Sequence, residues 1–302
     1  MLLCGARQSV GERSRRDALG DLYSPRRRND FSEGPWVLCE GVSIRIDVLL
    51  SDWPIMHHLK IWRRLLAEFI GSAVLATLVI GSGIAAQQLS PGNIGLQLFE
   101  NAAATAVGLY AIILVLAPVS GAHLNPVVSL VDAIEGGISW RVAGSYIPVQ
   151  VAGCVAGAAL ANTMFSMRVL SISQHHRITG PHFLSEVVAT AGLVVLIFGL
   201  SRTHRAALTP AAVGAYIGAA YFFTSSTSFA NPAITVGRMF SNTFTGIAPS
   251  SVPWFVLAQI VGGLLALLGL RALFPVRAFL PGDGSDHVHG ASRPIEGSAH
   301  HD

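Results

Sequence analysis

Charged residues are scarce in this chain: Lys, Arg, Asp and Glu make up 12% of its 302 residues. Between Leu65 and Leu270 the sequence holds six arginines and five acidic residues. A soluble enzyme of that length needs a solvated, charged surface, which so few charges cannot supply. The scarcity excludes a soluble enzyme core, and the pI near 9.0 reflects the tails and loops rather than a nucleic-acid-binding face.

Cysteine is also rare. The three cysteines, Cys4, Cys39 and Cys154, are too few and too scattered for a disulfide framework or a thiolate metal site. The long apolar segments contain no paired histidines, no two carboxylates on one face and no cysteine nucleophile with a base. Catalysis by acids and bases, metals or nucleophiles depends on such groups. We therefore predict that the protein is not an enzyme and uses no cofactor or metal.

Hydrophobic residues dominate: they make up 51% of the chain, and the mean hydropathy is +0.53. A helix needs about 20 apolar residues to cross the hydrocarbon core of a bilayer. Six segments approach that length: 65–85, 98–117, 140–164, 183–201, 207–226 and 252–274. Two shorter ones, 123–132 and 229–240, are interpreted as re-entrant half-helices. The sequence thus predicts an all-α membrane protein with six transmembrane helices and two half-helices.

The two ends of the chain differ from this apolar middle. Residues 1–61 are rich in Arg and interrupted by Ser, Gly, Asp and Pro, so we expect a disordered basic extension, with Met56 as an alternative translation start. Residues 275–302 are rich in Gly, Ser, Asp and His and lack the apolar surface needed to fold alone, which predicts a disordered tail. The spacing of its histidines implies no metal-ligand geometry.

Basic residues flank the predicted helices unevenly. With the N-terminus inside, the cytoplasmic helix ends carry Lys60, Arg63, Arg64, Arg141, Arg202, Arg205, Arg271 and Arg277. The opposite ends carry Arg168, Arg177 and Arg238. Because cytoplasmic loops are enriched in Lys and Arg, we predict a multi-pass protein of the plasma (inner) membrane with both termini in the cytoplasm.

The apolar part of the chain consists of two similar halves, residues 62–164 and 183–274. Each half contains, in the same order, a Glu in an apolar helix, an Asn-Pro pair and a Gln. Because each half has three spans, an odd number, the second must lie upside down relative to the first, as in the inverted repeats of channels and transporters. A solute site is then expected near the midplane, where the halves meet.

The two Asn-Pro pairs are strong helix starts. An N-cap Asn accepts a hydrogen bond from an otherwise unpaired amide, and Pro at the first position has no amide to leave unpaired. The inverted repeat brings the helix starts at Asn125-Pro126 and Asn231-Pro232 together in mid-membrane, where their positive ends disfavour cations. The Asn side chains can then donate hydrogen bonds to a neutral, oxygen-bearing solute.

These motifs resemble those of the major intrinsic proteins, the family of aquaporins and aquaglyceroporins. The resemblance covers residues 62–274, which would form one channel domain, and rests on 120–127 (SGAHLNPV) and 224–238 (TSSTSFANPAITVGR). It implies a right-handed helical bundle, a homotetramer and passive conduction of small uncharged solutes. Residues 240–247 (FSNTFTGI) resemble the bacterial branch associated with arsenic-resistance operons.

The resemblance also assigns roles to the repeated residues. The pore boxes would be Asn125, Pro126, Val127, Asn231, Pro232 and Ala233. Val127 stands where Ala is usual, and we expect its larger side chain to narrow or reorient the constriction. The residues that support the re-entrant loops would be Glu68, Glu186, His123, Gln150 and Gln259. The alternative for the two glutamates is proton coupling in a secondary transporter.

Four positions near the outer mouth form the selectivity filter of this family. An ungapped count from the boxes assigns them to Thr105, Ala219, Ser228 and Ile234, with Val107 as the alternative to Thr105. Water-selective members resemble one another in having an aromatic residue, a His and an Arg there, and Ile234 occupies the Arg position. The smaller residues predict a wider, less polar opening. Arg238, a possible pore cation one helical turn further on, either points elsewhere or partly replaces the missing Arg.

The sequence therefore predicts a passive channel for small uncharged hydroxylated solutes. The arsenic-operon resemblance favours arsenite in the form of arsenous acid, with methylated arsenicals, glycerol and water as further solutes. The alternatives are a generic glycerol facilitator, a water channel and, less favoured, a proton-coupled transporter, which would need titratable partners in the spans. The expected partners are neutral solutes, the bilayer and further copies of the chain, but no nucleic acid.

Overall fold

The structure is a computed structural model that describes residues 59–274. The predictions for the basic extension and the His-rich tail lie outside these residues, except that the first helix already includes Ile61. The described helices are α3 (Ile61–Leu89), α4 (Ile94–Ser120), α5 (Pro126–Glu135), α6 (Trp140–Met164), α7 (Gly180–Arg202), η1 (Ala206–Leu208), α8 (Thr209–Phe223), α9 (Pro232–Arg238), η2 (Pro249–Ser251) and α10 (Val252–Leu273).

Within residues 59–274, six helices are long and apolar enough to cross a membrane. They are α3, α4, α6, α7, α8 together with the η1 turn, and α10 together with the η2 turn. The six predicted spans are therefore confirmed. The half-helices differ from their predicted bounds, because both begin at a proline and the residues before each proline form an irregular loop. The first half-helix runs on to Glu135 and ends at Gly136, whose φ of 83° is left-handed.

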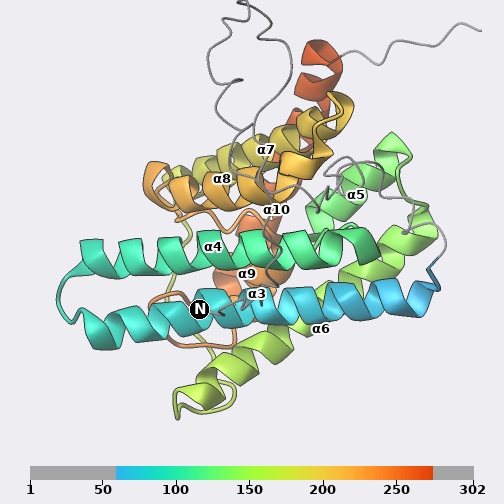
Figure 1. Cartoon of the computed structure of the whole chain (residues 1–302). Helices are drawn as coiled ribbons and strands as arrows, with labels where there is room; N and C mark the ends of the chain where they lie inside the picture. The colour runs from blue at the N-terminus through green and yellow to red at the C-terminus, as the bar shows by residue number, and fades with distance from the viewer. Residues whose placement is uncertain (1–58, 275–302) are drawn as a thin grey trace, which may run out of the picture. The chain divides into compact units, whose positions relative to one another are not determined.

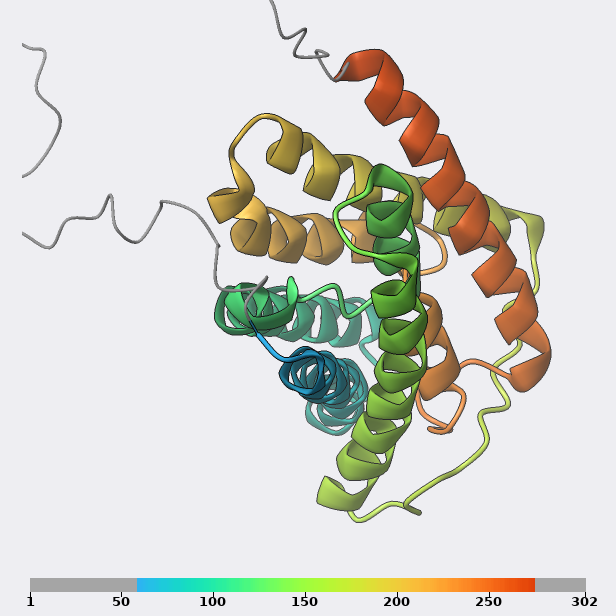
Figure 2. The same ribbon diagram turned by 90° about the vertical axis from the view of Figure 1, so that its right-hand side faces the viewer.

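The two halves of the chain use the same packing plan. The α3 helix packs on α6 in the first half, and α7 packs on α10 in the second. Figure 2 shows α6 crossing α3 and α10 crossing α7. Glycines make both crossings close, because a Cβ on Gly157 would collide with the Ala73 carbonyl and one on Gly262 would lie 2.5 Å from the Val187 carbonyl. Small residues let transmembrane helices approach in this way.

The half-helices lie inside this arrangement. Both α5 and α9 contact α6 and α10, and α9 also contacts α3 (Figure 1). Each half-helix is thereby held by spanning helices of both halves. This packing brings the first residues of α5 and α9 together, while their last residues point in opposite directions, as an inverted repeat requires.

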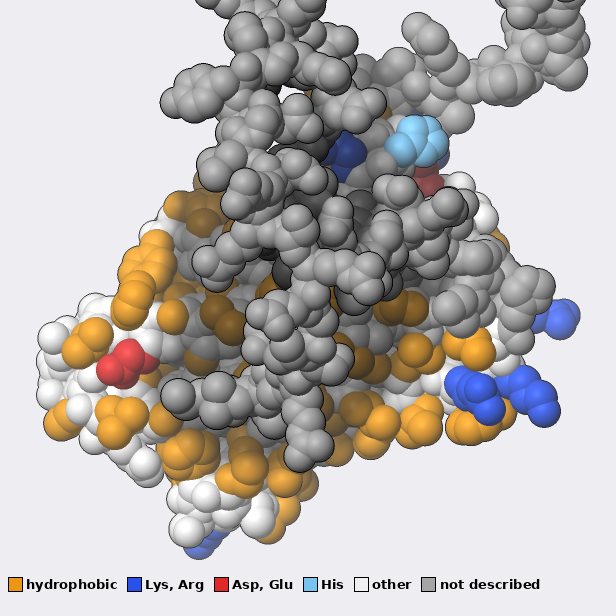
Figure 3. Space-filling view, in the orientation of Figure 1, with side chains coloured by type: hydrophobic (Ala, Val, Ile, Leu, Met, Phe, Trp, Pro, Cys, Tyr) orange, Lys and Arg blue, Asp and Glu red, His pale blue; other side chains and the backbone are white. Residues whose placement is uncertain are grey.

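The outer surface of the described part is apolar. Large hydrophobic side chains are exposed on every spanning helix, for example Trp62 on α3, Val107 on α4 and Leu264 on α10. Figure 3 shows hydrophobic side chains across the visible face over α3 and α4, with the charged side chains near the ends of the helices. A face of this kind is suited to lipid or to another apolar protein surface.

Candidate functional site

The two Asn-Pro pairs start the half-helices. Asn125 and Asn231 are N-caps in an extended conformation, with φ and ψ of −152° and 120° and of −155° and 113°. Asn125 Oδ1 accepts a hydrogen bond of 2.9 Å from the Val127 amide, and Asn231 Oδ1 accepts one of 2.9 Å from the Ala233 amide. Because the Oδ1 atoms are used for capping, each side-chain Nδ2 group points away from its own helix.

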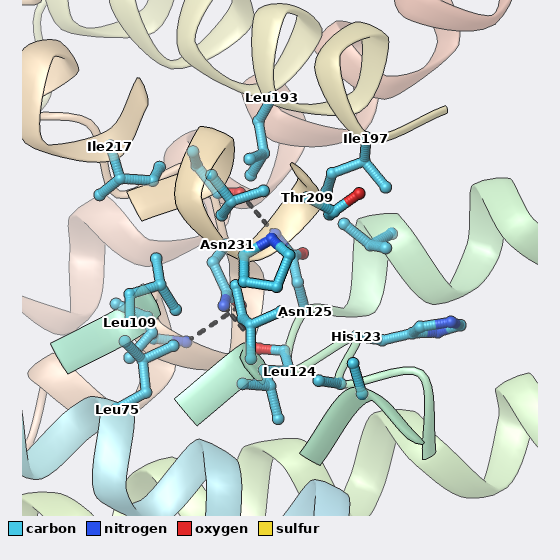
Figure 4. A pocket seen from close by; sticks show the side chains of 18 of the residues that line it. Leu75, Leu109, His123, Leu124, Asn125, Leu193, Ile197, Thr209, Ile217 and Asn231 are labelled. Carbon is cyan, nitrogen blue, oxygen red and sulfur yellow. Dashed lines mark hydrogen bonds between the residues drawn. The ribbon is translucent and has the colours of Figure 1, made fainter. Parts of the chain in front are cut away.

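The two Asn side chains also bond across the repeat. Asn125 Nδ2 donates to the Ala230 carbonyl at 2.8 Å, and Asn231 Nδ2 donates to the Leu124 carbonyl at 2.7 Å. A primary amide has two N–H groups, so each Asn keeps one donor for a solute. Figure 4 shows both side chains in the middle of the cavity, with Leu109 to one side and His123 to the other.

The loops before the two prolines have an unusual backbone. Ala122 and Leu124 have φ values of 45° and 51°, and their counterparts Ser228 and Ala230 have 49° and 48°. Left-handed conformations of non-glycine residues cost about 1–3 kcal/mol each and persist only where the surroundings enforce them. The same strain at matching positions of both halves indicates a structural requirement of the site.

Glu68 holds the first loop. Its Oε1 accepts hydrogen bonds from Ser120 Oγ at 2.6 Å and from the His123 amide at 3.0 Å. Its Oε2 accepts from the Leu124 amide at 2.7 Å and from Gln150 Nε2 at 2.8 Å. The carboxylate is fully buried, and four donors compensate the cost of burying its charge.

Glu186 repeats this arrangement in the second half. Its Oε1 accepts from Ser226 Oγ at 2.6 Å and from the Phe229 amide at 2.9 Å. Its Oε2 accepts from the Ala230 amide at 2.8 Å and from Gln259 Nε2 at 2.7 Å. The order Glu, Asn-Pro, Gln in the sequence therefore corresponds to one hydrogen-bonded unit that the fold builds twice.

A cavity of about 360 Å³ runs past the Asn pair. Most of its wall is aliphatic, with side chains from α3, α4, α7 and α8 such as Leu75, Leu109, Leu193 and Ile217. The polar side chains of the wall come from both halves of the chain. A largely apolar wall with a few fixed polar groups is typical of a binding or conduction site for small molecules.

Three of the four predicted filter residues line this cavity: Thr105, Ser228 and Ile234. All three are buried. The Ser228 hydroxyl has no hydrogen-bond partner among the described residues. Val107, the alternative to Thr105, is 69% exposed on the outside of α4 and is therefore excluded.

Ala219 differs from the prediction. It lies on the exposed face of α8, outside the cavity wall. Ile217 and Tyr221, two residues to either side, line the cavity in its place, and Tyr221 Oη lies 3.2 Å from Thr105 Oγ1. Residues two apart point to nearly opposite sides of a helix, so an error of two positions in the ungapped count moves the predicted residue from the cavity to the surface.

Arg238 reaches the cavity from one turn further along α9. It is buried, lines the cavity, and donates through Nε to the Thr245 carbonyl. Its guanidinium carbon lies 3.4 Å from the centre of the Phe229 ring. Arg177, in the loop after α6, lies over the same ring at 5.4 Å. The sequence assigns no site role to either residue: Phe229 lies within the 224–238 motif but not at a box or filter position, and the loop that carries Arg177 has no motif.

Arg177 fixes the loop that Arg238 also contacts. It donates to the Gly246 carbonyl at 2.9 Å and to the Phe244 carbonyl at 3.1 Å. Burial lowers the pKa of Arg177, while the charge of Glu186 acts in the opposite direction. A guanidinium stays protonated at neutral pH. Two positive charges therefore lie near this end of the cavity.

His123 lies at the other end of the cavity. Its Nδ1 is 3.1 Å from Ser129 Oγ, its Nε2 is 3.3 Å from Asp132 Oδ2, and its ring packs edge-on against Tyr146. His123 thus both lines the cavity and contacts the half-helix. Asp132 also lines the cavity, although it was not among the predicted site residues.

Val127 does not line the cavity. Its side chain packs with Val194 and Leu267 of the spanning helices, in the space that a Cβ on Gly263 would occupy. The expected narrowing of the constriction by Val127 therefore does not occur, because the third position of the box faces α10 instead of the solute path.

The chain was compared with known proteins. Residues 55–230 match the family described as major intrinsic protein. The chain is 45% identical to aquaglyceroporin AqpS of Rhizobium meliloti, over 74% of this chain and 96% of that protein. It is 32% identical to the glycerol uptake facilitator protein of Pseudomonas aeruginosa, over 76% of this chain and 92% of that protein. The fold is similar to the X-ray structure of the aquaglyceroporin from Plasmodium falciparum, with a TM-score of 0.57, 20% identity and coverage of 70% of this chain and 96% of that one.

Within residues 59–274, the six spanning helices and the two half-helices that meet beside a cavity define a multi-pass membrane channel. The chain belongs to the major intrinsic protein family. It is an aquaglyceroporin-type channel for small neutral solutes, and the members of this family are not enzymes. The family, the helical membrane fold and the channel function predicted from the sequence are thereby confirmed.

Proposed function

We propose that the channel conducts small uncharged hydroxylated solutes, with arsenous acid as the main solute and methylated arsenicals, glycerol and water as further ones. The observation that carries this proposal is the cavity wall around Ile234, where an aliphatic side chain replaces the filter Arg of water-selective relatives. Without a guanidinium at that position, the path keeps room for a solute larger than water.

The polar groups of the cavity suit a solute with several hydroxyls. The free N–H groups of Asn125 and Asn231 are donors, and the hydroxyls of Thr105, Ser228 and Tyr221 can donate or accept. Arsenous acid carries three hydroxyls on one atom and glycerol carries three on a carbon chain. Either solute loses hydrogen bonds to water when it enters the cavity, and hydrogen bonds to these polar groups can replace them. The aliphatic wall between these groups offers no fixed site that would hold the solute.

Glycerol is the second candidate for the main solute. The Pseudomonas relative is named a glycerol uptake facilitator, and the polar groups just described would serve glycerol equally well. The resemblance of residues 240–247 to the arsenic-operon branch favours arsenous acid. The two assignments predict opposite orders of permeability: arsenous acid above glycerol, or glycerol above arsenous acid. This order can be measured directly.

A stopped-flow panel on proteoliposomes tests the proposal. Osmotic gradients of glycerol and of arsenous acid are applied alongside a water-permeability measurement, with protein-free liposomes as the baseline. We expect permeability above baseline for all three and the largest increase for arsenous acid. An increase for water alone would contradict the proposal, and a larger increase for glycerol than for arsenous acid would assign the protein as a glycerol facilitator.

The two buried glutamates act in this proposal as supports of the re-entrant loops. Each carboxylate already accepts four hydrogen bonds, and no basic side chain pairs with either one among the described residues. A proton-coupled transporter needs a carboxylate that exchanges its proton during the cycle. Solute accumulation driven by a pH gradient in the same liposomes would contradict the supporting role.

The remaining features of the proposal concern placement in the cell. Residues 62–274 form the channel domain, with repeats 62–164 and 183–274, in the plasma (inner) membrane. Both termini face the cytoplasm, in accordance with the excess of basic residues at those helix ends. Labelling of single cysteines introduced at Arg141 and at Arg168 in intact cells checks the orientation: only the second should react with an impermeant reagent.

A further inference from the structure

The two half-helices carry charges of opposite sign at the same position of the repeat. Asp132 is the seventh residue after Asn125, and Arg238 is the seventh after Asn231. Both line the cavity. Within residues 59–274, no other Asp or Glu and no other Lys or Arg is part of the cavity wall. Because α5 and α9 point in opposite directions from the Asn pair, the two charges lie at opposite ends of the cavity.

The positive groups of the cavity repel cations but not anions. The N-termini of α5 and α9 each contribute roughly half a positive charge at the centre, and Arg238 adds a full charge at one end. An anion would be attracted to both places. A negative group on the path opposes the entry of anions, and the cavity wall contains one, Asp132.

Asp132 contacts His123, whose Nε2 lies 3.3 Å from Asp132 Oδ2. Its partner His123 has Nδ1 3.1 Å from Ser129 Oγ, and Ser129 Oγ accepts a hydrogen bond of 3.0 Å from Gln150 Nε2. The Ser129 hydroxyl can donate to His123 Nδ1, and in that arrangement the proton of a neutral imidazole lies on Nε2, facing Asp132. In that tautomer His123 donates a hydrogen bond and does not neutralise the carboxylate.

The nearby basic side chains have other partners. Arg202 pairs with Glu135 and donates to the Leu270 carbonyl at 2.8 Å. Arg64 donates through Nε to Tyr146 Oη at 2.9 Å, while its Nη2 has no hydrogen-bond partner among the described residues. Neither is part of the cavity wall. The wall around Asp132 thus contains an acidic group that no Lys or Arg of the described residues compensates.

We propose that Asp132 is the anion barrier of the pore and that Arg238, its counterpart in the second half, is the cation barrier. The excluded anions are small monovalent ones, such as nitrate, chloride and the conjugate bases of hydroxylated acids. The inference rests on the proposed function, because it assumes that the cavity is the conduction path. It adds a selectivity residue that lies outside the predicted filter.

Conductance of the purified full chain in planar bilayers tests the inference, with nitrate as the anion and sodium as the cation. We expect Asp132→Asn to raise the nitrate conductance at least about tenfold over wild type, and Arg238→Gln to raise the sodium conductance instead. Asn retains the size of Asp and an oxygen that can accept from His123, so the substitution removes charge while keeping the hydrogen bond. Glu100→Gln is the matched control, because Glu100 bonds to Ser90 outside the cavity wall, and it should conduct as wild type does.

The same preparations are assayed for glycerol and arsenous-acid flux, which separates this inference from the proposed function. A wild type that conducts neither solute overturns the proposed function, whatever the ion conductance. Asp132→Asn with glycerol flux but with wild-type nitrate conductance overturns the anion barrier. If Asp132→Asn does not fold, Asp132→Ser gives the same reading with a smaller side chain. An equal rise of nitrate conductance in Glu100→Gln also overturns the assignment to Asp132.

Discussion

At the scale of single residues, the buried glutamates are the most constrained side chains of the site. Each accepts four hydrogen bonds, two of them from backbone amides of a strained loop. Glutamine has the same shape but places an NH2 group where one oxygen accepts two bonds. At least one buried donor then loses its acceptor.

We predict that Glu68→Gln and Glu186→Gln each destabilise the protein. A buried donor without an acceptor costs roughly 1–3 kcal/mol, and for a domain of this size each kcal/mol lowers the Tm by roughly 2–4 °C. Thermal denaturation in mild detergent measures the effect, with Glu100→Gln as the control because Glu100 is only partly buried. An unchanged Tm in both variants would contradict the loop-supporting role.

Ile234 gives a prediction about selectivity. Ile234→Arg adds a large side chain and five donors to a wall that already contains Arg238. We expect the permeabilities to arsenous acid and glycerol to fall about tenfold, which corresponds to ~1.4 kcal/mol of barrier, while water permeability falls less. Ile234→Leu conserves volume and should keep the wild-type ratios. If Ile234→Arg reaches the membrane with all three permeabilities in unchanged proportion, Ile234 is not part of the filter.

At the scale of helices, the starts of α5 and α9 define the centre of the pore. We predict that Asn231→Asp reduces neutral-solute flux or admits cations, because it puts a carboxylate at the centre and replaces the donor to the Leu124 carbonyl by an oxygen. Asn125→Asp is its counterpart in the first half and should act in the same direction. Glycerol flux and sodium conductance are the measurements, and wild-type values of both in folded protein would argue against a central position.

Helix crossings give a prediction with an internal control. Gly157→Ala places a methyl group against the Ala73 carbonyl, where α6 meets α3, whereas a methyl group on Gly144 of the same helix meets no atom within 4 Å. Gly157→Ala should lower the Tm, and Gly144→Ala should raise it slightly, since Ala is favoured over Gly in helices by roughly 0.5–1 kcal/mol. Equal effects of the two substitutions would contradict the close-packing role.

Helix existence could be predicted from this sequence better than helix orientation. The length and hydropathy of the apolar segments predict the six spans, and the Asn-Pro pairs predict where the half-helices begin. The sequence predicts less well which face of a helix points to the cavity, because α8 is apolar on both its buried and its exposed faces. The ungapped count from Asn231 assigns Ala219 to the filter, and the apolar sequence of α8 holds no signal that it lies outside the cavity. Asp132 was missed because a single acid near a half-helix end has no motif, although its counterpart Arg238 was noticed.

At the scale of the whole molecule, the exposed apolar faces allow the chain to contact lipid or further copies of itself. We predict a homotetramer in which each protomer has its own pore, as the family resemblance implies. Crosslinking in native membranes and size analysis in mild detergent test this, with flux measured on the same material. A monodisperse monomer under both conditions would contradict the assembly, while leaving the channel function in place.

The crossed bonds between the Asn side chains and the opposite loops have a consequence for biosynthesis. When the first half has entered the membrane, the donor of Asn125 and the Leu124 carbonyl have no partners until residues 230 and 231 arrive. The interior of the membrane holds no water that could take the place of these hydrogen-bond partners. The solute path can then form only after the second half has been translated and inserted, so an incomplete chain stalled after its third span would not leave an open, leaking pore in the membrane.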